Sequence, residues 1–169
     1  MIILFRNSNK KVNLECSTEE GAVTMEILKA REETLNGYLA LVNGKLYIPY
    51  TQRPYEWNKT QISRLLNDIL AVYEGKQEQH ILNFITIYKN EDGLNIYDGQ
   101  QRTVSLLIIL CALVDRLRKL GNNTATQKVI SEYICKEDWR SADLIEYKIN
   151  FQNERTNNFF REYIINGNT

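Results

Sequence analysis

Residues 94–110 read LNIYDGQQRTVSLLIIL, and they predict a strand that passes at Asp98-Gly99 directly into a helix. The preceding run, residues 81–88, is apolar and β-branched, and residues 90–93 carry turn chemistry, so the two runs should form a β-hairpin. The helix is expected from about Gln100 to Lys119. Because its first half is apolar nearly all round, we expect it to be the central core helix.

The junction between strand and helix is a candidate anion site. A helix start leaves backbone N–H groups unpaired and carries partial positive charge, so a phosphate can dock there, and Gly99 permits a close approach. Arg102 can grip phosphate oxygens with two parallel hydrogen bonds, while Gln100 and Gln101 can donate to oxygen or orient a water. Beside a phosphate, Asp98 fits as a metal ligand, as a water-activating group or as the helix cap.

The same junction also allows a purely structural interpretation. The aspartate would cap the helix and the arginine would form a salt bridge, with no ligand involved. However, two glutamines and an arginine at the opening turn of a buried helix are poorly explained by packing, and this favours a functional site.

A second candidate constellation is QRPYEW, residues 52–57. Arg53 is another side chain that can bind an anion in bidentate fashion, and Gln52 provides another amide. Tyr55 and Trp57 have flat rings on which a base could stack. Alternatively, the two aromatic residues anchor the loop to the core and Arg53 bonds a carboxylate. The residues of this segment leave both interpretations open.

Two further elements around this segment can be predicted. A helix expected over Lys59–Glu74 has Asn58 as N-cap and Gln61 as its capping-box partner. The apolar residues of this helix recur at helical spacing and predict a stripe that faces the core. Residues 46–50 form a β-rich run, and Pro49 within it indicates an edge or irregular strand.

The chain divides into a short N-terminal part and one domain. Residues 1–24 lack sustained periodicity and are interpreted as a loosely ordered arm, with Met25 as a candidate natural start. Residues 25–169 are expected to form an α+β domain with a small mixed sheet. The hairpin of the sheet should lead directly into the central buried helix, and further helices should surround that helix. Because the amphipathic segment at residues 154–165 has nothing visible to pack on, we expect the domain to be truncated in its C-terminal helical part.

Composition excludes several functional classes. Lys plus Arg and Asp plus Glu both number 21, so no overall basic field indicates nucleic acid, and any DNA contact would be local. The cysteines Cys16, Cys111 and Cys135 have no metal-binding spacing, which favours a reduced, cytoplasmic setting. His80 is the single histidine of the sequence, whereas the metal site of a histidine-metal nuclease needs more than one imidazole side chain. No apolar run is long enough to span a bilayer, so a membrane partner is not expected.

The two motifs together carry a family resemblance. IPYTQRPYEW at residues 48–57 and IYDGQQRTVSLLIIL at residues 96–110 resemble, in the same order, the N-terminal domain of GmrSD-type modification-dependent restriction endonucleases. The resemblance covers about residues 30 to 120 well. It implies a fold similar to the ParB and sulfiredoxin group, in which a comparable glycine turn and helix start hold nucleotide phosphate or DNA. This chain departs from the family at Asn83, where glycine is usual.

In that family the DGQQR element is associated with the binding and hydrolysis of nucleotide triphosphates, which regulates DNA cleavage. The resemblance therefore implies an NTP, either GTP or ATP, and Mg²⁺ as cofactors. Carried over by position, the catalytic phosphate and metal end would consist of Asp98, Gly99, Gln100, Gln101 and Arg102, with Asp98 as the metal ligand. Gln52 and Arg53 would line the opposite wall of the nucleotide site, and Tyr55 and Trp57 match the aromatic residues of the family.

The sequence supports three hypotheses. The domain could be an NTP-binding and hydrolysing regulatory module of a DNA restriction or antiphage system. It could instead be a ParB-like module that recognises a DNA phosphate or modified base without turnover, or a folded but inactive remnant. In the family, cleavage usually resides in a C-terminal HNH-type nuclease domain, whose histidines this chain does not have. We therefore expect no nuclease activity from this chain alone, and a nuclease domain or subunit as its partner.

Overall fold

The computed structural model describes residues 2–6, 28–41, 46–90, 93–137 and 145–166, and it confirms the predicted α+β class. The helices and strands, in chain order, are β1 (Ile2–Arg6), β2 (Leu28–Glu32), α1 (Leu35–Leu41), β3 (Leu46–Ile48), α2 (Lys59–Tyr73), β4 (Phe84–Asn90), β5 (Gly93–Asp98), α3 (Gln100–Lys119), α4 (Asn123–Val129), β6 (Cys135–Glu137), β7 (Ile145–Tyr147), β8 (Ile149–Phe151) and α5 (Glu154–Phe159). π-Helical turns extend α4 over Ile130–Ile134 and α5 over Phe160–Ile165.

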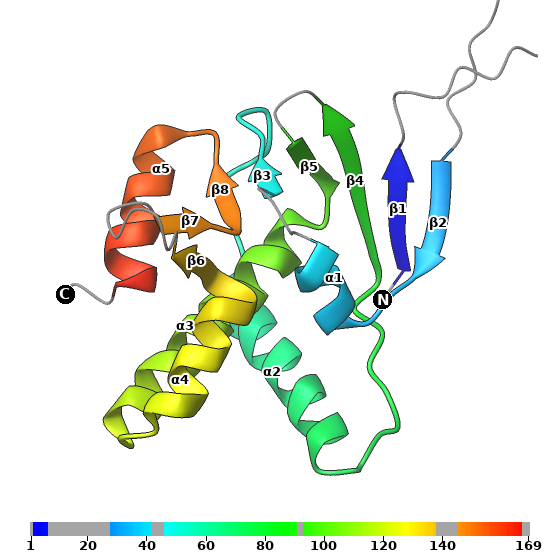
Figure 1. Ribbon diagram of the computed structural model, residues 1–169. Helices are drawn as coiled ribbons and strands as arrows, with labels where there is room; N and C mark the ends of the chain where they lie inside the picture. The colour runs from blue at the N-terminus through cyan, green and yellow to red at the C-terminus, as the bar shows by residue number, and fades with distance from the viewer. Residues whose placement is uncertain (1, 7–27, 42–45, 91–92, 138–144, 167–169) are drawn as a thin grey trace, which may run out of the picture.

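Six strands form one mixed sheet in the order β2-β1-β4-β5-β3-β8, and β6 pairs separately with β7. Figure 1 shows β8 and α5 at one edge of the sheet and β1 and β2 at the other. β4 and β5 are antiparallel neighbours, which confirms the predicted hairpin, and β3 runs parallel to both β5 and β8. This arrangement is consistent with the ParB-like fold that the sequence resemblance implied.

The first strand corrects the prediction of a loosely ordered N-terminal arm. Ile2–Arg6 pair antiparallel with β2 and parallel with β4, so the prediction is wrong for these five residues. Without β1, the edge of β4 would leave a row of backbone N–H and C=O groups without partners, and strand pairing satisfies them. The rest of the predicted arm, residues 7–24, and the candidate start Met25 lie outside the described residues.

The third strand corrects a second expectation. β3 lies between β5 and β8 and is therefore an internal strand, although Pro49 had indicated an edge or irregular one. β3 ends at Ile48, so the missing N–H of Pro49 removes no hydrogen bond from the sheet. The carbonyl of Pro49 instead accepts a hydrogen bond from the backbone N–H of Gln52 at 3.1 Å. This bond turns the chain into the segment of residues 52–57.

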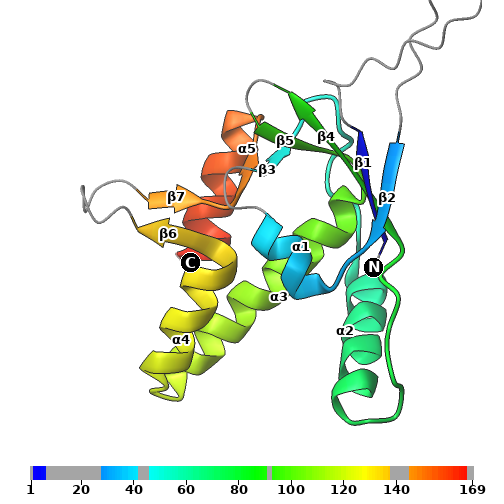
Figure 2. The same cartoon turned by 45° about the vertical axis from the view of Figure 1, so that its right-hand side comes forward.

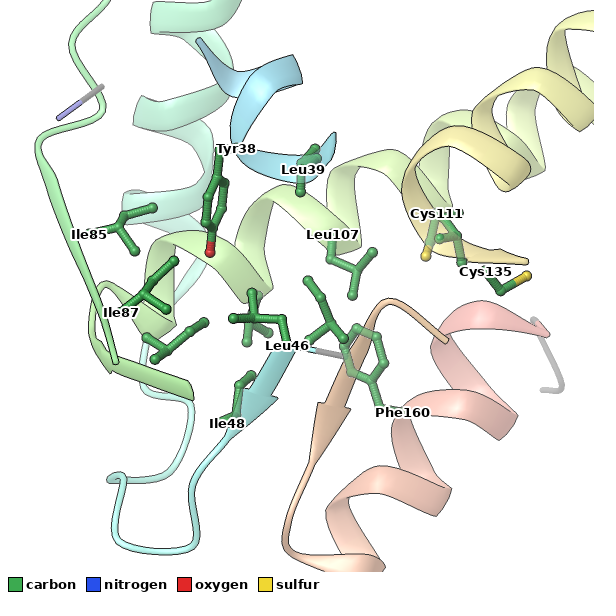
Figure 3. Packing of buried hydrophobic residues seen from close by; sticks show 14 of the residues in the cluster. Tyr38, Leu39, Leu46, Ile48, Ile85, Ile87, Leu107, Cys111, Cys135 and Phe160 are labelled. Carbon is green, nitrogen blue, oxygen red and sulfur yellow. The ribbon is translucent and has the colours of Figure 1, made fainter. Parts of the chain in front are cut away.

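α3 is the central core helix that its sequence predicts. Figure 3 shows Leu107 and Cys111 of α3 among side chains from α1, the sheet and the C-terminal helix. The buried core residues of α3 are Val104, Leu106, Leu107, Cys111 and Val114. Although α3 is apolar, no helix in the described part of the chain combines the length and apolarity needed to cross a membrane.

α2 packs less deeply than its sequence predicts. Its start is confirmed, since the Asn58 side chain caps the helix and Gln61 completes the capping box. Its predicted core-facing stripe is confirmed only in part. Leu65 is buried. Ile62, Ile69 and Val72 are half-buried, and the prediction is wrong for Leu66 and Tyr73, which are exposed. The exposed large apolar side chains of α2 are Leu66, Leu70 and Tyr73. Figures 1 and 2 show the physical reason, which is that α2 projects away from the sheet.

The described cysteines are core residues. Cys111 is a buried free thiol, Cys135 is also buried, and Cys16 lies outside the described residues. Burial, with a smaller contribution from Cys135, raises the pKa of the Cys111 thiol to about 11. Because this thiol is protonated at neutral pH, it is neither a ready nucleophile nor a ready metal ligand.

Asn83 adopts the left-handed conformation that glycine would supply at the same place. Its φ is +69°, and asparagine tolerates this region better than most residues with a side chain. The carbonyls on either side of it, those of Leu82 and Phe84, both accept hydrogen bonds from Arg102. The side chain of Asn83 therefore does not prevent the left-handed backbone shape that accompanies both contacts of Arg102.

Replacing Asn83 tests this account of the backbone. Asn83→Gly should leave the free energy of unfolding within about 1 kcal/mol of the parent protein, because glycine enters the left-handed region freely. Asn83→Val should lower it by about 1–3 kcal/mol, because a β-branched side chain is strained there. Urea unfolding measures both changes. Equal stability of the two variants would contradict the account.

Candidate functional site

The start of α3 is shaped by Gly99. Its φ is +98°, and a Cβ at this position would lie 2.8 Å from Cγ1 of Ile85, so both conformation and space require glycine. No side chain in the described ranges of the chain caps the helix. The structural interpretation in which Asp98 caps α3 is therefore wrong. The first backbone N–H groups of the helix remain available for an anion.

Gln101 ties the start of α3 to the segment of residues 52–57. Its Oε1 accepts hydrogen bonds from the backbone N–H of Glu56 at 2.8 Å and of Trp57 at 3.3 Å. Its Nε2 donates to the carbonyl of Pro54 at 2.9 Å. The Gln101 side chain is 7% exposed, so these bonds are shielded from water. Gln101 thus joins two segments that lie 47 residues apart in the chain.

Two further glutamines strengthen this connection. Nε2 of Gln100 donates to the carbonyl of Arg53 at 3.1 Å, and Nε2 of Gln52 donates to the carbonyl of Tyr97 at 2.9 Å. Oε1 of Gln100 is buried and has no hydrogen-bond partner within the described part of the chain. An unpaired buried acceptor costs about 1–3 kcal/mol, so a donor supplied by a bound molecule would be favoured there.

Arg102 has both a structural contact and free donors. Its Nη1 donates to the carbonyls of Leu82 at 3.0 Å and Phe84 at 2.7 Å. Its Nη2 lies 3.6 Å from Oδ2 of Asp98, which confirms the ion pair of the structural interpretation. A guanidinium carries five N–H donors, so Nε and Nη2 can still contact an anion.

Arg53 is held more loosely than Arg102. Its Nη1 lies 3.0 Å from Oε2 of Glu56, and the two side chains are 66% and 56% exposed. The structural interpretation of this arginine, in which it bonds a carboxylate, therefore describes a real contact. Such an exposed pair contributes only about 0–1 kcal/mol, so a doubly charged phosphate can compete for Arg53.

Two tyrosines support the first turns of α3 through hydroxyl relays. Ser105 donates its hydrogen to the carbonyl of Gln101, so the Tyr55 hydroxyl must donate to Ser105 Oγ, at 2.8 Å. Thr103 donates to the carbonyl of Gly99, and Tyr38 reaches Thr103 at 2.9 Å. Tyr55 therefore anchors the loop to the core.

Sequence reasoning missed Ser105 and Thr103 as supporting residues. Helical spacing could have found Ser105, which lies four residues after Gln101 on the same face of α3. Burial raises the pKa of Tyr38 far above its ordinary value, so its hydroxyl keeps the proton that this contact needs. The pairing of Tyr38 with Thr103 has no signal in the sequence.

The predicted site residues line one hollow of about 160 Å³, which we call the phosphate hollow. The predicted convergence of the two motifs is therefore present in the structure, apart from Tyr55, which lines a neighbouring hollow. The residues that line the phosphate hollow are Gln52, Arg53, Trp57, Asp98, Gly99, Gln100, Gln101 and Arg102.

The charges of the phosphate hollow suit an anion that brings its own metal ion. Among the described lining residues, two guanidinium groups and the start of α3 face one carboxylate, that of Asp98. The described residues contain no cluster of three or more His, Cys, Asp or Glu side chains that could hold a metal ion. Mg²⁺ in nucleotide sites is commonly held by one or two carboxylates together with phosphate oxygens, so Asp98 fits a shared ion.

Substitution of Gln101 tests its role as the connection between the two segments. Gln101→Met preserves the volume but removes three hydrogen bonds, so the free energy of unfolding should fall by about 2–4 kcal/mol. The backbone amides of Glu56 and Trp57 should also lose protection against hydrogen exchange. Gln127→Met, at an exposed glutamine of α4, is the matched control. A loss no larger than that of the control would contradict this role.

Comparison with known proteins agrees with the sequence resemblance. Residues 32–169 match the family model of the GmrSD restriction endonuclease N-terminal domain. No match to a curated protein was found. The family match covers well over half of the chain and includes both motifs of the phosphate hollow. The chain therefore belongs to the family of GmrSD restriction endonuclease N-terminal domains and is a component of a restriction, or antiphage defence, system.

Proposed function

We propose that this domain is a cytoplasmic, nucleotide-binding regulatory module of its restriction system, and that it holds the phosphates of an NTP in the phosphate hollow. The observation that carries the proposal is the convergence of Arg53 and Arg102 on one hollow at the uncapped start of α3. Nuclease activity would come from a separate domain or subunit that this module regulates, with DNA as the substrate of the whole system.

The contacts around the hollow support unequal roles for the two arginines. Arg102 is 21% exposed and anchored to two carbonyls, so its remaining donors are directed before a ligand arrives. Arg53 is mostly exposed and can move from Glu56 to a phosphate. A preorganised cation together with a mobile one is a suitable arrangement for a ligand that must enter and leave.

Hydrolysis is the finer part of the proposal. Asp98 would share Mg²⁺ with the phosphates, and Oε1 of Gln100, which has no partner among the described residues, would orient the attacking water. Both polar atoms of Gln101 are engaged with the backbone of residues 54–57, so we assign it a positioning role. The Mg²⁺ ion, when bound, would neutralise charge that develops on the phosphate oxygens.

The alternative function is recognition of a DNA phosphate or a modified base without turnover, since the same groups would contact either kind of phosphate. The two functions differ in their salt dependence and in their competitors. A DNA-binding module should lose affinity steeply with salt, whereas a nucleotide site should saturate with free NTP. Binding of duplex DNA that free Mg·NTP does not displace would favour the alternative.

Charge removal at Arg53 gives the cleanest test of nucleotide binding. In calorimetric titrations with Mg·ATP and Mg·GTP, Arg53→Gln should weaken binding of the preferred nucleotide by about tenfold or more, because a charge-assisted hydrogen bond contributes about 1.5–3 kcal/mol. Its free energy of unfolding should be unchanged, since only an exposed ion pair is lost. Arg64→Gln, at an exposed arginine of α2, is the control. Equal affinities for Arg53→Gln and the parent protein would reject the proposal.

A second test concerns the metal ion. Asp98→Asn should abolish the gain in nucleotide affinity that Mg²⁺ produces, and any Mg²⁺-dependent hydrolysis with it, because the hollow loses its carboxylate. Without Mg²⁺ the variant should bind nucleotide at least as well as the parent, since Arg102 is freed from its ion pair. Asp115→Asn is the matched control, because Asp115 pairs with Lys119 at the same i,i+4 spacing on α3. An unchanged Mg²⁺ effect in Asp98→Asn would exclude this role.

A further inference from the structure

A second hollow adjoins the phosphate hollow. Its volume is about 170 Å³, and it shares Gln52, Arg53 and Gln100 with the first. Beyond these shared residues it reaches the end of β3 and the turn between β8 and α5. We call it the β3–α5 hollow. The two hollows therefore form neighbouring parts of one surface region, divided by side chains that belong to both.

The two hollows differ in charge. The charged residues of the phosphate hollow are Arg53, Arg102 and Asp98, whereas the described residues that line the β3–α5 hollow include one charged side chain, that of Arg53. Apart from that shared arginine, the second lining is neutral, with proline and aromatic carbon beside a few amide and hydroxyl groups. One charged and one neutral compartment match a molecule with a highly charged end and a neutral end.

The volumes of the two hollows also suit a ligand that occupies both. Pockets that enclose a whole small ligand usually measure about 300–1,000 Å³, so neither hollow alone could enclose an entire nucleotide. Their volumes of about 160 and 170 Å³ each suit one part of such a ligand. A nucleotide that extends across the shared residues would use both.

We propose that the β3–α5 hollow holds the nucleoside part of the nucleotide whose phosphates occupy the phosphate hollow. This inference rests on the proposed function. The ligand would be a nucleoside triphosphate that is recognised at both ends, and not a free polyphosphate that is held by its charge alone.

The lining of the β3–α5 hollow can recognise a base in two ways. Tyr50 is 71% exposed, and its ring provides a face for stacking, while Pro49 and Phe151 supply apolar walls. Oδ1 of Asn153 is engaged with Thr156. The amide nitrogen of Asn153 makes no hydrogen bond within the described part of the chain and can donate to a base acceptor.

The test compares an NTP with inorganic triphosphate, which carries the charged end alone. In calorimetric titrations with Mg²⁺, the preferred one of ATP and GTP should bind the parent protein at least about tenfold more tightly than triphosphate, because it gains stacking and hydrogen bonds in the β3–α5 hollow. Tyr50→Ala should bring the affinity for the NTP close to that for triphosphate and leave the affinity for triphosphate unchanged. Tyr73→Ala, at a tyrosine of α2 that is 86% exposed, is the matched control and should change neither.

The possible failures are distinguishable. Equal affinities of the parent protein for NTP and triphosphate would overturn this inference and leave the proposed function standing. Loss of the NTP advantage in Trp57→Ala but not in Tyr50→Ala would also overturn it, because the base would then lie on the phosphate side. Absence of binding for both ligands would refute the proposed function itself, and this inference with it.

Discussion

The structure around the candidate site depends on the buried side-chain amide of Gln101. Its three hydrogen bonds to the backbone of residues 54–57 hold a loop against the first turn of α3. Because the amide is shielded from water, loss of these bonds would leave backbone groups unsatisfied, so loop and helix start are fixed together. Arg53 reaches the mouth of α3 only because the loop that carries it is held there. The phosphate hollow is therefore a consequence of one glutamine that touches no ligand in our proposal.

The structural contacts of the site residues do not exclude the functional roles that we propose for them. Arg102 uses Nη1 to hold the carbonyls on either side of Asn83 and keeps other donors for an anion. Asp98 pairs weakly with Arg102, so a metal ion that takes the carboxylate would release the arginine towards the phosphates. Nucleotide and metal would thus favour each other's binding, which is the form of coupling that a regulatory module needs.

The sequence predicted local features well where one segment contains all the determinants. The capping box at Asn58 and the passage of the hairpin into α3 each depend on neighbouring residues. The sequence also predicted that the two motifs converge, because both contain side chains that packing explains poorly. Predictions failed where the partner lies elsewhere in the chain. Periodicity on α2 indicates an apolar face but not what covers it, and Ile2–Arg6 become a strand only because β2 and β4 are there to pair.

The individual roles of the glutamines could not be predicted, for a related reason. A side-chain amide in a motif provides two donors and two acceptor lone pairs, but its hydrogen-bond partners depend on the tertiary structure. Gln100, Gln101 and Gln52 were all candidates for ligand contact, and each has an Nε2 that donates to a backbone carbonyl. Among the buried side-chain oxygens of these glutamines, Oε1 of Gln100 is the one for which the described part of the chain supplies no partner. The residue types of a motif therefore predict which segments come together better than they predict which atoms stay available for a ligand.

The central claim is that residues 52–57 and 99–102 form a single anion site. Titration of inorganic triphosphate into the ¹⁵N-labelled protein, followed by amide NMR signals, tests it most directly. The account predicts that signals from both segments shift together with one common dissociation constant, while those of residues 62–73 on α2 stay in place. Shifts confined to one of the two segments, or different dissociation constants for the two, would contradict it.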